Sequence, residues 1–124
     1  LNEGTDVAII ANGDTVRLAI EAAQKLEGEG LSVRLVDMHT IKPLDEDEVK
    51  NCVATGAIVT VEDHTIMHGL GAGVSQVVAR EGGARVRQIG IQDQFGQSAT
   101  YEELLEMNGI TVDGIVEAVH ELNA

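Results

Sequence analysis

Short apolar runs that alternate with helical periodicity constrain this sequence more than any other feature. Short segments typical of strands occur at residues 6–11, 31–38, 56–62 and 85–91, and the first of them, DVAIIA, is a continuous apolar run, as expected of a strand covered on both faces. Stretches with apolar residues three and four positions apart follow them, as helices with one buried stripe require. Strands that alternate with helices form a largely parallel sheet between helix layers. The sequence predicts one α/β domain with four clear strands. Because four strands make a small sheet, either the pattern misses a fifth strand or the domain packs against a neighbouring domain.

Capping residues mark where three of the predicted helices begin. Asp45 with Glu48, and Thr100 with Glu103, have the spacing of a capping box, in which each side chain bonds the backbone amide of the other residue. Thr111 is predicted to cap the last helix. These residues mark helix starts in the second half of the chain. The sequence shows no recognisable linker or internal repeat.

Composition argues against several classes of partner. The net charge of −13 argues against nucleic acid or an anionic membrane surface as a partner, because both require a basic face on the protein. No apolar run approaches the ~20 residues of a membrane span. Cys52 is the only cysteine, so no intramolecular disulfide can form, and we expect a cytoplasmic protein. Because the sequence begins with Leu1 and not with Met, it is consistent with a fragment or processed piece of a longer chain.

Polar residues gather where the predicted strands end. In an open α/β sheet, ligands bind at the carboxyl ends of the strands, so these residues are candidates for one shared rim. The same pattern is expected in a domain without a site, because loops must be solvated. The rim candidates are Asn12, Asp14, His39, Asp93 and Phe95.

The richest stretch is VEDHTIMHGLGAGVSQVV, residues 61–78, where a strand passes through ionisable residues into a glycine-rich turn and a helix. Its candidate residues are Glu62, Asp63, His64, His68, Gly69 and Gly71. Backbone amides at the start of the helix could receive a phosphate. The glycines, however, are out of register with the dinucleotide fingerprint and follow the third strand, not the first. The alternative is that they only let the chain reverse and let the helix approach closely.

Metal binding and nucleophilic catalysis find weaker support in the same stretch. His64 and His68 are four residues apart, but the residues between them lack the glutamate of a zinc protease, and the glycines that follow make a helix there unfavourable. Asp63 and His64 are neighbours on a strand and should point to opposite faces, which is poor geometry for an acid–base pair. Ser75 lacks the glycine-x-serine-x-glycine pattern. Residue pattern alone therefore predicts a polar strand-end rim and names no reaction.

Four segments taken together resemble a known family. They are EGTDVAIIANG at 3–13, VDMHTIKPLDEDEV at 36–49, TGAIVTVEDHTIMHGLGAGVSQVVA at 55–79, and IGIQDQFGQSATYEELLEMNGIT at 89–111. In this order they are similar to the carboxyl-terminal domain of transketolase, and less closely to the equivalent domains of 1-deoxyxylulose-5-phosphate synthase and of 2-oxo-acid dehydrogenase β subunits. One departure is His68, which stands where the family usually has the first of two glycines.

The resemblance implies a fold, an activity for the parent enzyme, and partners. The fold would be a three-layer α/β/α sandwich with a five-stranded mixed sheet, one strand running against the rest. The parent enzyme would transfer two-carbon ketol units between sugar phosphates, as in pentose phosphate metabolism, with thiamine diphosphate and Mg²⁺. Both would be held by the pyrimidine- and diphosphate-binding domains, so this chain is expected to bind no cofactor or metal, to catalyse nothing alone, and to contribute to a homo-oligomer.

Under this resemblance, the stretch from Glu62 to Gly71 would be a contact loop between domains or subunits. Two alternatives stay open. One is the matching domain of a 2-oxo-acid dehydrogenase β subunit or of 1-deoxyxylulose-5-phosphate synthase. The other is a free-standing regulatory module that binds an anion or nucleotide at the strand-end rim.

Overall fold

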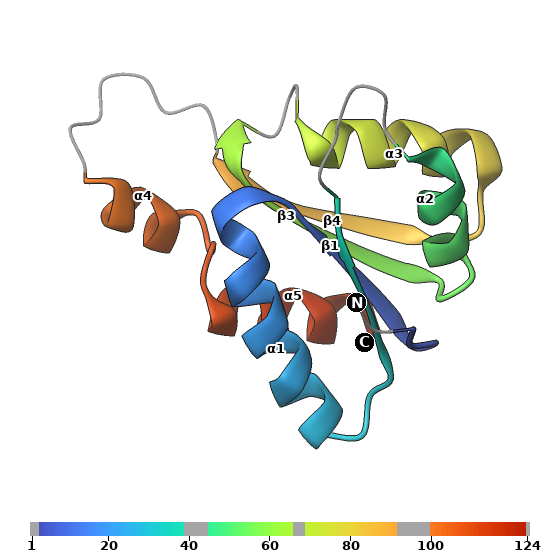
Figure 1. Ribbon diagram of the computed structural model, residues 1–124, viewed down its shortest axis with the longest axis horizontal. Helices are drawn as coiled ribbons and strands as arrows, with labels where there is room; N and C mark the ends of the chain where they lie inside the picture. Colours follow the sequence, from blue (N-terminus) through green and yellow to red (C-terminus); the bar gives the residue numbers. More distant parts are fainter. Residues whose placement is uncertain (1–2, 39–44, 66–68, 92–99, 124) are drawn as a thin grey trace.

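The computed structural model describes residues 3–38, 45–65, 69–91 and 100–123 (Figure 1). Within these residues, four strands form one sheet in the order β2-β1-β3-β4, and all three pairings are parallel. The strands are β1 (Val7–Ala11), β2 (Val33–Asp37), β3 (Ala57–Thr65) and β4 (Arg85–Ile91). The four predicted strands are confirmed.

Helices cover both faces of the sheet, as the alternating pattern predicts. Figure 1 shows α1 and α5 on one face and α2 and α3 on the other, while α4 lies to one side. The helices are α1 (Val16–Gly28), preceded by the short 3-10 helix η1 (Gly13–Thr15), then α2 (Glu46–Val53), α3 (Leu70–Glu81), α4 (Tyr101–Met107) and α5 (Val112–Asn123). This is the predicted three-layer α/β/α sandwich. Among the described residues, none of the helices has the length and apolar character needed to cross a bilayer.

The prediction of a five-stranded mixed sheet is wrong for the described part of the chain. The described residues form four strands, and none of them runs against its neighbours. The physical reason is that a helix lies between each strand and the next, and such a crossover returns the chain in the same direction. The residue pattern indicated these four strands and left a fifth as one alternative, whereas the antiparallel fifth strand came from the family resemblance.

The side-chain alternation of the strands divides the core into two halves. Val7, Ile9 and Ala11 of β1 pack with residues of α1 and α5, whereas Ala8 and Ile10 pack with residues of α2 and α3. All five are fully buried. A strand that is apolar on both faces needs two helix layers to keep it from water, which is why the sequence of β1 is a continuous apolar run.

The predicted helix starts are confirmed, with one difference. Thr100 and Glu103 form both halves of a capping box at α4, and Thr111 Oγ1 accepts the amide of Gly114 at 2.9 Å at α5. At α2, Asp45 accepts the amide of Glu48 at 3.1 Å. The Glu48 carboxylate turns instead to Arg34 on β2, because an ion pair between the layers is available to it.

Candidate functional site

Glu62, the first ionisable residue of the predicted loop, is a fully buried side chain at the amino end of α3. One carboxylate oxygen accepts the backbone amide of Leu70 at 2.8 Å, and the other accepts the amide of Gly71 at 2.7 Å. The first amides of a helix have no partner within the helix and carry a partial positive charge, so a carboxylate is a favourable acceptor there. Glu62 therefore binds the end of β3 to the start of α3.

Two glycines make room for this contact. A β-carbon on Gly69 would overlap the Glu62 carboxylate. A β-carbon on Gly71 would lie 2.7 Å from Oε1 of Gln88, which extends from β4. Neither glycine has a positive φ angle, so close approach and not backbone freedom requires glycine. The glycine-rich turn is explained by the side chains that lie against it, in agreement with the close-approach alternative.

The same contact weakens the case for a phosphate site at this helix. An incoming anion would need the amides of Leu70 and Gly71, and both already donate to Glu62. It would also meet the negative charge of that carboxylate. The arrangement therefore disfavours a nucleotide or diphosphate at the amino end of α3.

The carboxyl end of β1 is held against β3 by Thr15 of η1. Its hydroxyl lies 2.6 Å from the carbonyl oxygen of Asn12 and 2.9 Å from that of Val61. Asn12 itself is about nine-tenths buried, and its Oδ1 has no hydrogen-bond partner among the described residues. Asp63 lies beside this turn, since its Oδ1 is 3.9 Å from the point where a β-carbon on Gly13 would stand. Thr15 and Gly13 thus place Asn12 near Val61 and Asp63 of β3 at one edge of the sheet.

The remaining candidates divide into two groups. Asp14 is exposed at the same edge. The backbone of His64 belongs to β3, which continues to Thr65 after a register shift, three residues beyond the predicted end of the strand. The His64 side chain lies outside the described residues, and so do His39, His68, Asp93 and Phe95. Within the described ranges, no three His, Cys, Asp or Glu side chains are grouped to hold a metal ion.

Sequence reasoning missed a polar pair behind the glycine turn. Gln88 on β4 pairs in register with Thr60 on β3, and its Nε2 donates to Ser75 Oγ of α3 at 2.9 Å. The Thr60 hydroxyl is fully buried and has no hydrogen-bond partner in the part of the chain that the structure describes. The period-two pattern of RVRQIGI could have placed Gln88 on the face of β4 next to α3, but no local signal identifies Ser75 as its partner.

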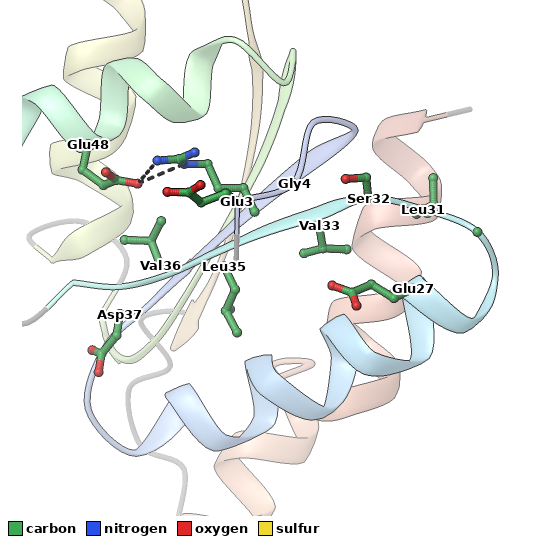
Figure 2. Close-up of a pocket in the computed structure, with 12 residues that line it drawn as sticks. Glu3, Gly4, Glu27, Leu31, Ser32, Val33, Leu35, Val36, Asp37 and Glu48 are labelled. Atoms are coloured by element: carbon green, nitrogen blue, oxygen red, sulfur yellow. Dashed lines mark hydrogen bonds and ion pairs between the residues drawn. The ribbon is translucent and has the colours of Figure 1, made fainter. Parts of the chain in front are cut away.

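A groove of about 1050 Å³ follows β2, and the described residues that line it include none of the predicted candidates (Figure 2). Its wall includes the ion pair in which Arg34 Nε and Nη2 lie 3.0 and 2.8 Å from Glu48 Oε1, drawn as dashed lines in Figure 2. The hydrogen bond to Glu48 raises the pKa of the Arg34 guanidinium. Arg34 is the only cationic residue among the described residues that line the groove, and it is already paired.

Cys52 lies on α2 next to this ion pair and is fully buried. Burial, and then the nearby Glu48 carboxylate, raise the pKa of the thiol to about 12. A thiol is nucleophilic as its thiolate, so Cys52 is inert near neutral pH.

With this geometry in place, comparison with known proteins identifies the family. The family model described as "Transketolase, C-terminal domain" matches residues 1–115. The chain belongs to the transketolase C-terminal domain family.

Relatives agree with this assignment over almost the whole transketolase C-terminal domain. The chain is 37% identical over 123 residues to the 6-deoxy-6-sulfo-D-fructose transketolase subunit SqwH of Clostridium sp. (strain MSTE9), covering 98% of this chain and 38% of that protein. It is 36% identical over 125 residues to the 1-deoxy-D-xylulose-5-phosphate synthase of Bacillus cereus (strain B4264), covering 98% of this chain and 20% of that protein. A solved structure described as a split gene transketolase, inactive beta4 tetramer, superposes with a TM-score of 0.89 at 41% identity, covering 98% of this chain and 40% of that one.

The transketolase C-terminal domain described here thus spans well under half the length of the relatives that it matches. The domain occurs as part of larger transketolase-like proteins, in which other domains accompany it. Its best-defined polar feature, the contact of Glu62 with α3, is internal to the fold.

Proposed function

We propose that this chain is the assembly domain of a thiamine-diphosphate-dependent transketolase that moves two-carbon ketol units between sugar phosphates in the cytoplasm. The observation that carries the proposal is the match of 98% of this chain to 38% of a transketolase subunit. In this proposal the domain is inactive alone, packs beside the pyrimidine- and diphosphate-binding domains, and contributes to a homo-oligomer.

The loop after β3 is the proposed contact surface. Glu62 joins β3 to the start of α3, because its carboxylate accepts the first amides of that helix. The stretch between Glu62 and α3 includes the candidates Asp63, His64 and His68. A buried anchor with polar residues beyond it suits a surface that meets another domain in one fixed orientation.

Thiamine diphosphate and Mg²⁺ are proposed to bind elsewhere in the parent enzyme. The described residues do not fit either group. The helix amides that could receive a diphosphate are already bonded to Glu62, and the described ranges offer no cluster of three metal-binding side chains. No catalytic step is therefore assigned to this domain.

The test is reconstitution. The chain is combined with the polypeptide that precedes this domain in the longer protein, and ketol transfer between sugar phosphates is measured for each part and for the mixture. We expect activity only in the mixture. Activity of the upstream polypeptide alone, at the rate of the mixture, would show that the domain is dispensable and would contradict the proposal.

A second activity is favoured by one observation. The chain is also 36% identical over 125 residues to a 1-deoxy-D-xylulose-5-phosphate synthase. The reconstituted mixture should therefore also be assayed for 1-deoxyxylulose-5-phosphate formation and, for the β-subunit alternative, for oxidative decarboxylation of 2-oxo acids. Whichever product accumulates assigns the parent enzyme, while the assembly role is common to all three.

The regulatory-module alternative has its own test. A ligand at a hundred times its dissociation constant stabilises a protein by roughly 2.7 kcal/mol. A thermal-shift screen of phosphates and nucleotides is expected to show no such stabilisation, because Glu62 already occupies the amino end of α3. A clear shift with one anion would favour the module.

A further inference from the structure

An open cleft of about 710 Å³ separates the start of α1 from α4, and neither the contact loop nor the groove along β2 accounts for it. In Figure 1, α4 lies to one side of the layers, near the amino end of α1. The cleft is lined from three directions: by η1 and the first turn of α1, by one face of α4, and by the turn into α5. Its apolar residues are Leu18, Leu105, Ile110 and Val112.

The apolar surface of the cleft is only partly covered by the domain itself. Ile110 is fully buried and forms a fixed floor. Leu18, Leu105 and Val112 pack against the core cluster but remain half-buried. Apolar side chains gathered in a concave surface are the usual mark of a binding site, because burying them removes apolar area from water.

The rim of the cleft is acidic. Asp14, Glu102 and Glu106 are exposed along it, and Arg17 is its one basic residue within the described residues. None of these four side chains has an ion-pair partner in the part of the chain that the structure describes. The rim carries three negative charges against one positive, on a chain whose net charge is −13. A complementary surface would be apolar at its centre and basic at its edge.

We propose that this cleft docks a protein segment of the upstream part of the parent enzyme, one that presents an apolar side chain beside a lysine or arginine. The proposal rests on the assembly role above and names a surface and a partner chemistry for it. A protein segment fits better than a small molecule, because small-molecule sites carry a few polar groups directed inward, whereas the charged groups here stand on the rim. More than half the length of the transketolase subunit that this chain matches lies outside the matched region and is available to supply the segment.

Charge reversal on the complex tests the chemistry of the partner. The double variant Glu102→Lys/Glu106→Lys is combined with the upstream polypeptide, and the dissociation constant is measured at two salt concentrations. The matched control is Glu21→Lys/Glu117→Lys, which changes the net charge equally at positions of α1 and α5 that do not line this cleft. We expect the dissociation constant to rise at least tenfold for the cleft variant and less than threefold for the control.

Photocrosslinking identifies the occupant. Benzoylphenylalanine replaces Leu105 in the same complex, and the crosslinked peptides are sequenced. A crosslink to an upstream peptide that contains an apolar residue beside lysine or arginine supports the proposal. Crosslinks only within this domain or to a second copy overturn it, and so does a cleft variant that binds as tightly as the control. If the unmodified chain binds no upstream polypeptide at all, the assembly role itself fails, so the two failures are distinguishable.

Discussion

The side chain of Glu62 fills the space in which a β-carbon on Gly69 would stand. The strand residue and the glycine that precedes α3 are thus one structural unit, although seven positions separate them in the sequence. The carboxylate replaces the missing side chain and satisfies two helix amides at the same time. This unit joins β3 to the start of α3, and its two members can be tested separately.

The negative charge of the Glu62 carboxylate should contribute more to stability than the shape of the side chain. In Glu62→Gln, the amide oxygen can still accept one backbone N–H, but the NH₂ group would face the other N–H as a second donor. A buried amide would then lack a partner, so we expect the free energy of unfolding to fall by about 3 kcal/mol. Urea denaturation measures this change. The exposed Glu21→Gln on α1 is the control and should change stability by less than about 0.5 kcal/mol. Equal effects of the two substitutions would contradict the role of Glu62.

Gly69 should not tolerate even a methyl group. In Gly69→Ala the added β-carbon overlaps the Glu62 carboxylate, which is anchored at both oxygens and cannot simply turn away. We expect a loss of about 2 kcal/mol or more by denaturant unfolding. Gly28→Ala on α1 is the matched control, because nothing lies within 4 Å of the position that its β-carbon would take. Alanine favours a helix over glycine, so the control should gain about 0.5 kcal/mol. A Gly69→Ala protein as stable as the control would show that the contact is loose.

The framework of the fold could be predicted from sequence because its causes are local. The strand that includes Ile9 and Ile10 is apolar on both faces, and Thr100 and Glu103 are only three residues apart. Periodicity and capping spacing are properties of one short segment, so they need no knowledge of the tertiary structure. The extra antiparallel strand was wrong for the described residues because no such local pattern supported it.

For the candidate site, the sequence could predict where in the fold the residues lie but not what each side chain contacts. Asn12 and Asp63 lie near each other at the carboxyl edge of the sheet, because the strands that precede or contain them are parallel neighbours. That Glu62 would be buried against α3 depends on the path of the chain between them. The pairing of Gln88 with Ser75 likewise joins a strand to a helix thirteen residues away. Such contacts are decided by packing of distant segments, and a single sequence contains no local signal for them.

Titration of Cys52 should weaken the fold at high pH. The folded-state pKa of the thiol is about 12, against 9.0 for an unperturbed thiol. Because the folded pKa is raised, the stabilisation is fully present below about pH 9 and is lost as pH rises from there toward 12. At pH 10 the loss should be roughly 1 kcal/mol, since one pKa unit corresponds to about 1.4 kcal/mol. Urea unfolding between about pH 8 and pH 10.5 measures the slope. The Cys52→Ala protein is less stable overall but should have a flatter slope, and identical slopes would contradict the prediction.

Two buried threonines should respond oppositely to valine. Thr60 is fully buried and its hydroxyl has no hydrogen-bond partner within the described ranges, so Thr60→Val removes an unsatisfied polar group and keeps the shape. We expect the free energy of unfolding to rise by about 1 kcal/mol. The hydroxyl of Thr15, also buried, bonds the carbonyl oxygens of Asn12 and Val61 and so joins η1 to β3. Thr15→Val removes this hydroxyl, so the Val61 carbonyl oxygen loses its side-chain donor, whereas the Asn12 carbonyl oxygen keeps the backbone N–H of residue 15, and we expect a cost of about 1 kcal/mol or more. Denaturant unfolding of the two variants side by side gives the sign of each change. If Thr60→Val destabilised the protein as much as Thr15→Val, the Thr60 hydroxyl would have to make a contact in solution that keeps it satisfied.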